Sequence, residues 1–166
     1  RRADLEVLAT AIEALSRCVP NFRIELGHAG FFKAIAAQLP IDDAVREDIR
    51  QYIEAKNYAA LDMVLDQLGE SKSVNAMRRL PRLFGGEEIL KEAAEFCVDH
   101  ASVETLSYLQ ELYSALTDLG IGDHIMIDLG LVQRTDYYTD IVFSAYVEGC
   151  GDAVLTGGRY DNLLAS

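Results

Sequence analysis

Two segments near the end of the sequence carry residue types that suit recognition of a small polar ligand. The first is the run Asp136-Tyr137-Tyr138-Thr139, which stands between two apolar, β-rich stretches. Phenol hydroxyls donate and accept hydrogen bonds, phenol rings can wall an imidazole, and a carboxylate can hold an ammonium group. A loop fixed between two strands presents such groups rigidly. The competing interpretation, which the pattern alone favours, is a pair of sheet-edge tyrosines with satisfied hydroxyls.

The second segment is Thr156-Gly157-Gly158-Arg159-Tyr160-Asp161, in which the two glycines directly follow a predicted strand. Paired glycines allow a backbone to approach a ligand closely. The segment does not predict a phosphate-binding loop, because it lacks the glycine spacing and the lysine of such loops. A plainer interpretation is that Arg159 and Asp161 pair with each other.

A third candidate is His28, which lies where a predicted strand passes into a helix. The N-terminus of a helix can bind an anion. The favoured interpretation is that the His28 side chain hydrogen-bonds the local backbone. The sequence contains no His, Cys and carboxylate spacing typical of a metal site, so we expect no metal.

The charge balance restricts the partners of the chain. It carries 15 Lys and Arg residues against 27 Asp and Glu residues, a formal net charge of -12. Such a polyanion repels phosphate backbones, so no nucleic-acid partner is expected. Arg78, Arg79 and Arg82 could form a local basic patch, but a solvated helix face is the favoured interpretation. Apolar runs near 18 residues are absent, which excludes a membrane span, and the cysteine spacing fits reduced thiols in a cytoplasmic protein.

The elements that must position these segments follow from periodicity. Up to about residue 120 most of the chain predicts helices, some with recognisable N-caps, and strands are predicted where apolar and polar residues alternate. Short polar loops between the later strands predict an antiparallel sheet. The predicted N-caps or first residues of helices are Asp42, Asn57, Ser73 and Ser102, and the predicted strands are residues 22–26, 125–129, 141–147 and 153–156.

The order of these elements predicts three parts. Residues 1–40 and 101–166 form one core of helix and sheet, and residues 41–100 form a helical lobe inserted between them. The sequence lacks an initial methionine and stops inside a segment without a clear end, which indicates a piece of a longer protein.

The tyrosine and glycine segments together resemble the histidyl-tRNA synthetase family. The matching blocks are Gln133-Arg134-Thr135-Asp136-Tyr137-Tyr138-Thr139-Asp140 and Gly157-Gly158-Arg159-Tyr160-Asp161-Asn162-Leu163. The resemblance implies an α+β fold of the class II aminoacyl-tRNA synthetase type, with an antiparallel sheet, flanking helices and a helical insertion. The catalytic arginine of the family falls at Gln133, whose neutral amide cannot offset developing negative charge. In extended backbone Arg134 points the opposite way, although a loop could turn it inward.

The stretch Ile24 to Ala34, with residues 56–69 and 80–86, resembles the regulatory subunits of ATP phosphoribosyltransferase, paralogues of the synthetase without aminoacylation. That resemblance implies a non-catalytic subunit without a cofactor that joins a short-form catalytic subunit in a hetero-oligomer. It further implies feedback inhibition by L-histidine in the first step of histidine biosynthesis. The alternative is a fragment of the catalytic core of a histidyl-tRNA synthetase, and a synthetase-like sensor module is a third possibility without sequence support. The resemblance implies that histidine contacts Tyr137, Tyr138 and Tyr160 in a pocket shaped by Asp136, Thr139, Gly157, Gly158 and Arg159.

Overall fold

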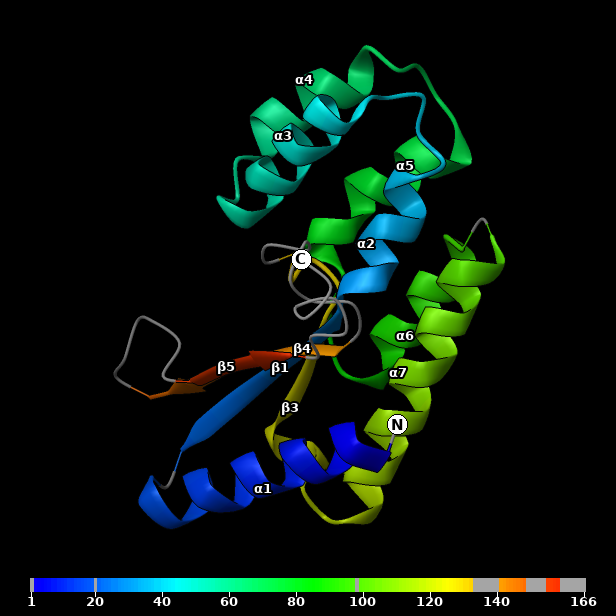
Figure 1. Cartoon of the computed structure of the whole chain (residues 1–166). Helices are drawn as coiled ribbons and strands as arrows, with labels where there is room; N and C mark the ends of the chain where they lie inside the picture. The colour runs from blue at the N-terminus through cyan, green and yellow to red at the C-terminus, as the bar shows by residue number, and fades with distance from the viewer. Residues whose placement is uncertain (1, 20, 98, 133–140, 149–154, 159–166) are drawn as a thin grey trace, which may run out of the picture.

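The computed structural model describes residues 2–19, 21–97, 99–132, 141–148 and 155–158. The chain begins with helix α1 (Arg2–Cys18), strand β1 (Phe22–His28) and helix α2 (Ala29–Ala36) (Figure 1). Helices and short turns then fill the chain up to the later strands. In order they are α3 (Asp43–Glu54), α4 (Tyr58–Asp66), α5 (Lys72–Arg79), η1 (Leu80–Arg82), β2 (Phe84–Gly85), α6 (Glu87–Glu95), α7 (His100–Asp118), η2 (Gly122–His124), β3 (Ile125–Asp128), β4 (Ile141–Val147) and β5 (Leu155–Gly158).

The strands form one sheet in the order β2-β3-β1-β4-β5. The pairs β1–β4 and β4–β5 are antiparallel, as predicted, and so is the pair of β3 with β2, a strand that was not predicted. In contrast, β1 and β3 run parallel, with Ile24 opposite Ile125 and Leu26 opposite Ile127. The physical reason is connectivity. A parallel pair needs a long crossover rather than a hairpin, and the whole stretch from α2 to η2 joins β1 to β3.

One face of the sheet is packed against helices. Its side chains alternate along each strand with those of the other face, and Ile24, Leu26 and Ile127 are fully buried. Helices α1 and α7 contact β1 on this side, where Leu8 and Ile12 of α1 are buried. Burying one such side chain contributes about 1.5–3 kcal/mol, so this face fixes the register of the sheet.

Side-chain caps set where several helices begin. Asp42 accepts a hydrogen bond from the Val45 N–H and Asn57 accepts one from the Ala60 N–H, which confirms both predicted N-caps. The prediction at Ser73 is wrong, because Ser71 caps α5 through the Val74 N–H.

The prediction that Ser102 caps α7 is also wrong by one turn. Asp99 is the N-cap, and Ser102 at the third helical position completes a capping box with it. Both residues are pattern matches for a cap, and the reciprocal pair decides which one begins the helix.

Helices α3 and α4 lie at the opposite end of the molecule from α1 (Figure 1). Their buried residues Ile49, Ile53 and Leu61 nevertheless belong to the same hydrophobic cluster as Ile24 of the sheet. The division of the chain at residues 40 and 100 stays a prediction. In the described part of the chain no helix is long and apolar enough to cross a membrane.

Candidate functional site

Four strand termini meet at one end of the sheet. The last residue of β1, His28, pairs with Ile141, the first residue of β4. The last residue of β5, Gly158, pairs with Val142. Because β3 runs parallel to β1, its last residue, Asp128, reaches the same end. The chain segments that enter β4 and leave β5 are therefore attached at one place.

These attachment points are where the sequence predicts its ligand-binding segments. Gly157 and Gly158 are part of β5, opposite Phe143 and Val142, so the strand extends beyond its predicted end at Thr156. The other predicted histidine contacts lie outside the described residues, as do Gln133 and Arg134. These contacts are Asp136, Tyr137, Tyr138, Thr139, Arg159 and Tyr160.

The His28 side chain hydrogen-bonds the local backbone, as the favoured interpretation predicts. Its Nδ1 accepts a hydrogen bond from the Gly30 N–H at 2.9 Å and so caps α2. The ring is buried, and its edge meets the ring of Tyr108 at a centroid distance of 5.9 Å. Because the imidazole occupies the cap position, the N-terminus of α2 is not a free anion site.

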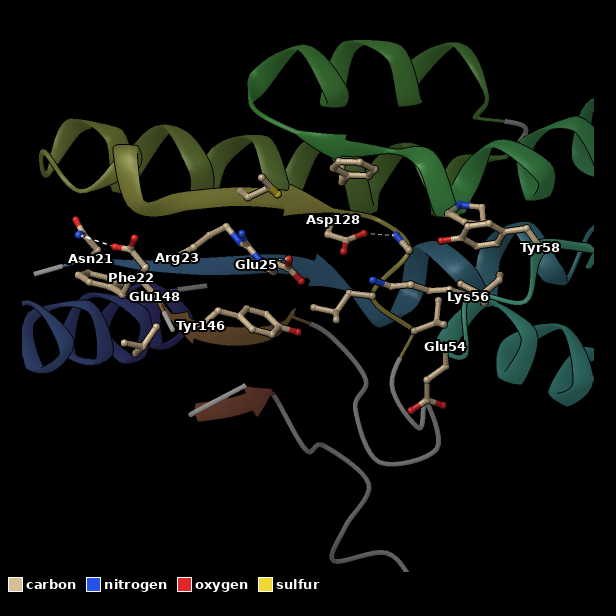
Figure 2. A pocket seen from close by; sticks show the side chains of 18 residues that line it. Asn21, Phe22, Arg23, Glu25, Glu54, Lys56, Tyr58, Asp128, Tyr146 and Glu148 are labelled. Carbon is tan, nitrogen blue, oxygen red and sulfur yellow. Dashed lines mark hydrogen bonds and ion pairs between the residues drawn. The ribbon is translucent and has the colours of Figure 1, made fainter. Parts of the chain in front are cut away.

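The other face of the sheet opens on a cleft of about 860 Å³. Arg23 and Glu25 of β1, Asp128 of β3 and Tyr146 of β4 point from the sheet into this space (Figure 2). Residues at the end of α3 and the start of α4 line its far side. The cleft thus lies between the sheet and the helical region, and it extends to the sheet end where β3 terminates.

Three carboxylates, Glu25, Asp128 and Glu148, and one arginine, Arg23, carry charge on the sheet side of the cleft. The Arg23 guanidinium lies 3.1 Å from the Glu25 carboxylate and 5.1 Å from the centre of the Tyr146 ring. Burial, and secondly the negative charge of Glu25, raise the pKa of Asp128 to about 6. The Asp128 Oδ1 accepts a hydrogen bond from the Gly130 N–H at 2.9 Å, which orients the carboxylate. The cleft therefore holds an acidic pair whose charge is only partly balanced.

The helical side contributes Glu54, Lys56 and Tyr58 (Figure 2). Lys56 follows α3 with φ of 57°, a left-handed backbone conformation that is unfavourable for a residue with a side chain. This turn ends α3 and lets Asn57 cap α4, and it places Lys56 at the cleft. Carboxylates, cations and phenols thus line one space, which suits a small zwitterion with an aromatic or heteroaromatic group.

The sequence pattern did not identify the residues that line this cleft. Arg23 and Glu25 alternate with Phe22, Ile24 and Leu26, and this period of two signals a strand with one polar face. The signal marks a polar face but does not say which other strands contribute to it. Tyr146 and Asp128 join that face only through strand pairing.

The two arginines of α5 are ion-paired and do not form a free basic patch. Arg78 is ion-paired with Asp62 and Asp66, and Arg79 with Glu92. For Arg78 and Arg79 these pairs agree with the interpretation of a solvated helix face. Among the described residues no group of three or more His, Cys, Asp or Glu side chains could hold a metal ion.

Comparisons with known proteins agree with this fold. A family model described as histidyl-tRNA synthetase matches residues 1–166. The ATP phosphoribosyltransferase regulatory subunit of Clostridium kluyveri is 38% identical over 98% of this chain. That match covers 43% of the relative, so the chain spans less than half the length of that protein.

Solved structures show the same likeness. An ATP phosphoribosyltransferase regulatory subunit/histidyl-tRNA synthetase from Bacillus halodurans C matches with a TM-score of 0.90 at 30% identity, over 98% of this chain and 44% of that chain. An ATP phosphoribosyl transferase (HisG:HisZ) complex from Thermotoga maritima matches with a TM-score of 0.75 at 21% identity, over 95% of this chain and 55% of that chain, and shows the fold alone. The predicted α+β fold of the class II synthetase type is confirmed.

Proposed function

This chain belongs to the histidyl-tRNA synthetase family, and we propose that it is part of a non-catalytic regulatory subunit of ATP phosphoribosyltransferase that binds L-histidine. The relative from Clostridium kluyveri carries the name of that regulatory subunit. A regulatory subunit implies a catalytic partner, so the proposed assembly is a hetero-oligomer with the short-form catalytic subunit.

One observation carries the histidine-binding part of the proposal. Gly158 pairs with Val142, so the end of β5 lies beside the start of β4. The Asp136-Tyr137-Tyr138-Thr139 segment precedes β4 in the chain, and Arg159 and Tyr160 follow β5. The sheet therefore attaches both predicted segments at the same end, where one small ligand can contact both.

The charged cleft supports a histidine ligand on chemical grounds. A zwitterion offers an ammonium group to Glu25 and Asp128, and a carboxylate to a cation such as Lys56. In this proposal Tyr137, Tyr138 and Tyr160 contact the imidazole, while Asp136, Thr139, Gly157, Gly158 and Arg159 shape the pocket. Tyrosines suit this role because a phenol both stacks and hydrogen-bonds.

The loss of catalysis rests on Gln133 in place of the family's arginine. Feedback control then requires a coupling free energy, in which histidine binds more tightly to the inhibited assembly than to the active one. By linkage, saturating histidine shifts the equilibrium between the active and the inhibited assembly by the same factor.

The second candidate function is the catalytic core of a histidyl-tRNA synthetase, because the tyrosine and glycine blocks are common to enzyme and regulator. One experiment separates them with the full-length protein. Adding it to a short-form catalytic subunit should start ATP phosphoribosyltransferase turnover, and histidine should inhibit that turnover. Charging of tRNA with histidine would contradict the regulatory proposal. Calorimetry that detects no histidine binding by the full-length protein would contradict both candidates.

A further inference from the structure

Arg50 joins the helical region to the segment that enters the predicted histidine loop. It lies on α3, and only 6% of its side chain is exposed. Its Nη1 donates a hydrogen bond to the main-chain carbonyl of Val132, 82 residues later in the chain, at 3.3 Å. Val132 is itself buried and directly precedes residue 133.

Two carboxylates of the same helix hold the guanidinium in place. Glu47 accepts hydrogen bonds from Nε at 2.9 Å and from Nη2 at 2.7 Å, and Glu54 accepts one from Nη1 at 2.6 Å. These hydrogen bonds, above all those to Glu47, raise the pKa of Arg50, so its charge is permanent. The two carboxylates therefore hold the planar guanidinium in one orientation. Its hydrogen bond to the Val132 carbonyl then costs little additional side-chain entropy.

Helical elements also hold the residues just before Val132. The Leu129 N–H donates to the Leu83 carbonyl after η1 at 2.9 Å. Gly130 lies against Pro81 so closely that a Cβ there would meet the Pro81 Cα at 3.1 Å. The residues between β3 and Val132 are therefore held at two places. Leu129 and Gly130 contact η1 and the residue that follows it, and Val132 is hydrogen-bonded to α3.

We propose that Arg50 is a positioning residue that couples α3 to the segment entering residues 133–140, and through it to histidine affinity. The inference rests on the proposed function, because it assumes that this segment carries the histidine contacts. A movement of α3 then shifts the Val132 carbonyl and changes the histidine affinity. Reciprocally, histidine binding changes the preferred position of α3 through the same contact.

Packing alone does not require an arginine at this position. Burying a charge costs free energy even when it is paired, and an apolar side chain of similar volume often stabilises such a site equally well. The guanidinium adds a directed hydrogen bond to the Val132 carbonyl, from a side chain that Glu47 and Glu54 hold in place. Lysine can keep the charge but has no planar fork to serve Glu47, Glu54 and Val132 together.

The test uses the full-length protein with Arg50→Lys and Arg50→Met, and Arg46→Met as the matched control. Arg46 lies one turn earlier on α3 and is ion-paired with Asp43 of the same helix. Two measurements are made well below the melting temperature of each variant. Hydrogen exchange follows the amides of residues 129–132, and calorimetry gives the Kd for L-histidine.

We expect amide exchange at residues 129–132 to become about tenfold faster in both Arg50 variants, and the histidine Kd to rise about tenfold, because a hydrogen bond to a charged group is lost. Arg46→Met should leave both values near those of the unchanged protein. Unchanged exchange at residues 129–132, an unchanged histidine Kd, or equal effects of Arg46→Met and Arg50→Lys would overturn the proposal. Should Arg50→Met fail to fold, Arg50→Lys still decides. Faster exchange in a protein that binds no histidine would instead overturn the proposed function and leave the mechanical link in place.

Discussion

Gly27 lies directly against the main chain of Asp128 on the neighbouring parallel strand. A Cβ built on Gly27 would be 2.6 Å from the Asp128 carbonyl oxygen and 3.2 Å from the Leu131 Cβ. A separation of 2.6 Å is shorter than any ordinary van der Waals contact, and the obstructing carbonyl oxygen belongs to the backbone. Only glycine therefore allows β1 and β3 to approach each other where both strands end.

Gly27→Ala should destabilise the protein by about 3 kcal/mol, because overpacking of this kind costs about 1–3 kcal/mol and here the backbone must move. Urea unfolding followed by circular dichroism measures the change. The matched control is Gly69→Ala, where φ is 77° but no atom lies within 4 Å. The control should lose about 1 kcal/mol from the left-handed backbone alone. Equal losses at both positions would show that strand approach is not the constraint.

The raised pKa of Asp128 predicts a pH dependence of stability. The folded protein keeps this proton up to about pH 6, whereas the unfolded chain releases it near the ordinary value of 3.8. The free energy of unfolding should therefore fall as the pH rises across this window, by up to about 3 kcal/mol. Asp128→Asn should remove this fall and retain an acceptor for the Gly130 N–H. Denaturation midpoints of both proteins at pH 4 and pH 7.5 test this, and a constant difference between them would contradict it.

Glu25→Gln provides an independent test of the same electrostatics. The negative charge of Glu25 is the second cause of the raised pKa of Asp128, after burial. Removing that charge should lower the pKa of Asp128 without restoring its ordinary value, because burial remains. Carboxyl chemical shifts measured by NMR across pH 3–8 would follow the titration. An unchanged titration of Asp128 would mean that the two carboxylates do not interact.

Tyr138→Ala should weaken histidine binding by the full-length protein at least tenfold, because truncating an aromatic contact in a binding site costs about 2 kcal/mol or more. Isothermal titration calorimetry gives the Kd, and circular dichroism checks that the sheet persists. Met63→Ala is a suitable control, since 69% of Met63 is exposed on α4. A histidine affinity that survives Tyr138→Ala would place the pocket elsewhere.

Ser102→Ala should lower the free energy of unfolding by about 1 kcal/mol, since Ser102 completes the capping box of α7. Its hydroxyl is buried and hydrogen-bonded to Asp99. Ser107→Ala, on an exposed position of the same helix, should be neutral or slightly stabilising. Thermal unfolding of the two variants compares them directly, and equal melting temperatures would contradict the capping role.

Local sequence was sufficient for much of the fold. The alternation of apolar residues predicted β4 at residues 141–147 with the observed bounds, and Asp42 and Asn57 were identified as caps from residue type and position. The prediction of Ser102 as the N-cap of α7 was wrong, because Asp99, which also suits an N-cap, holds that position. Their reciprocal hydrogen bonds, rather than residue type, place the start of α7 at His100.

For the candidate site, too, some features follow from the sequence and others only from the tertiary structure. The sequence by itself predicted the two ligand-type segments, and it determined the strands that flank them and the acidic charge, because these depend on residue type and on spacing along the chain. Only the tertiary structure decided that Asp128 joins Glu25 in one cleft and that Arg50 reaches the Val132 carbonyl. These relationships join residues about 80 to 100 positions apart, and the parallel pairing of β1 with β3 brings the cleft together. Pairing at that range is set by burial of whole strand and helix faces, which no local pattern encodes.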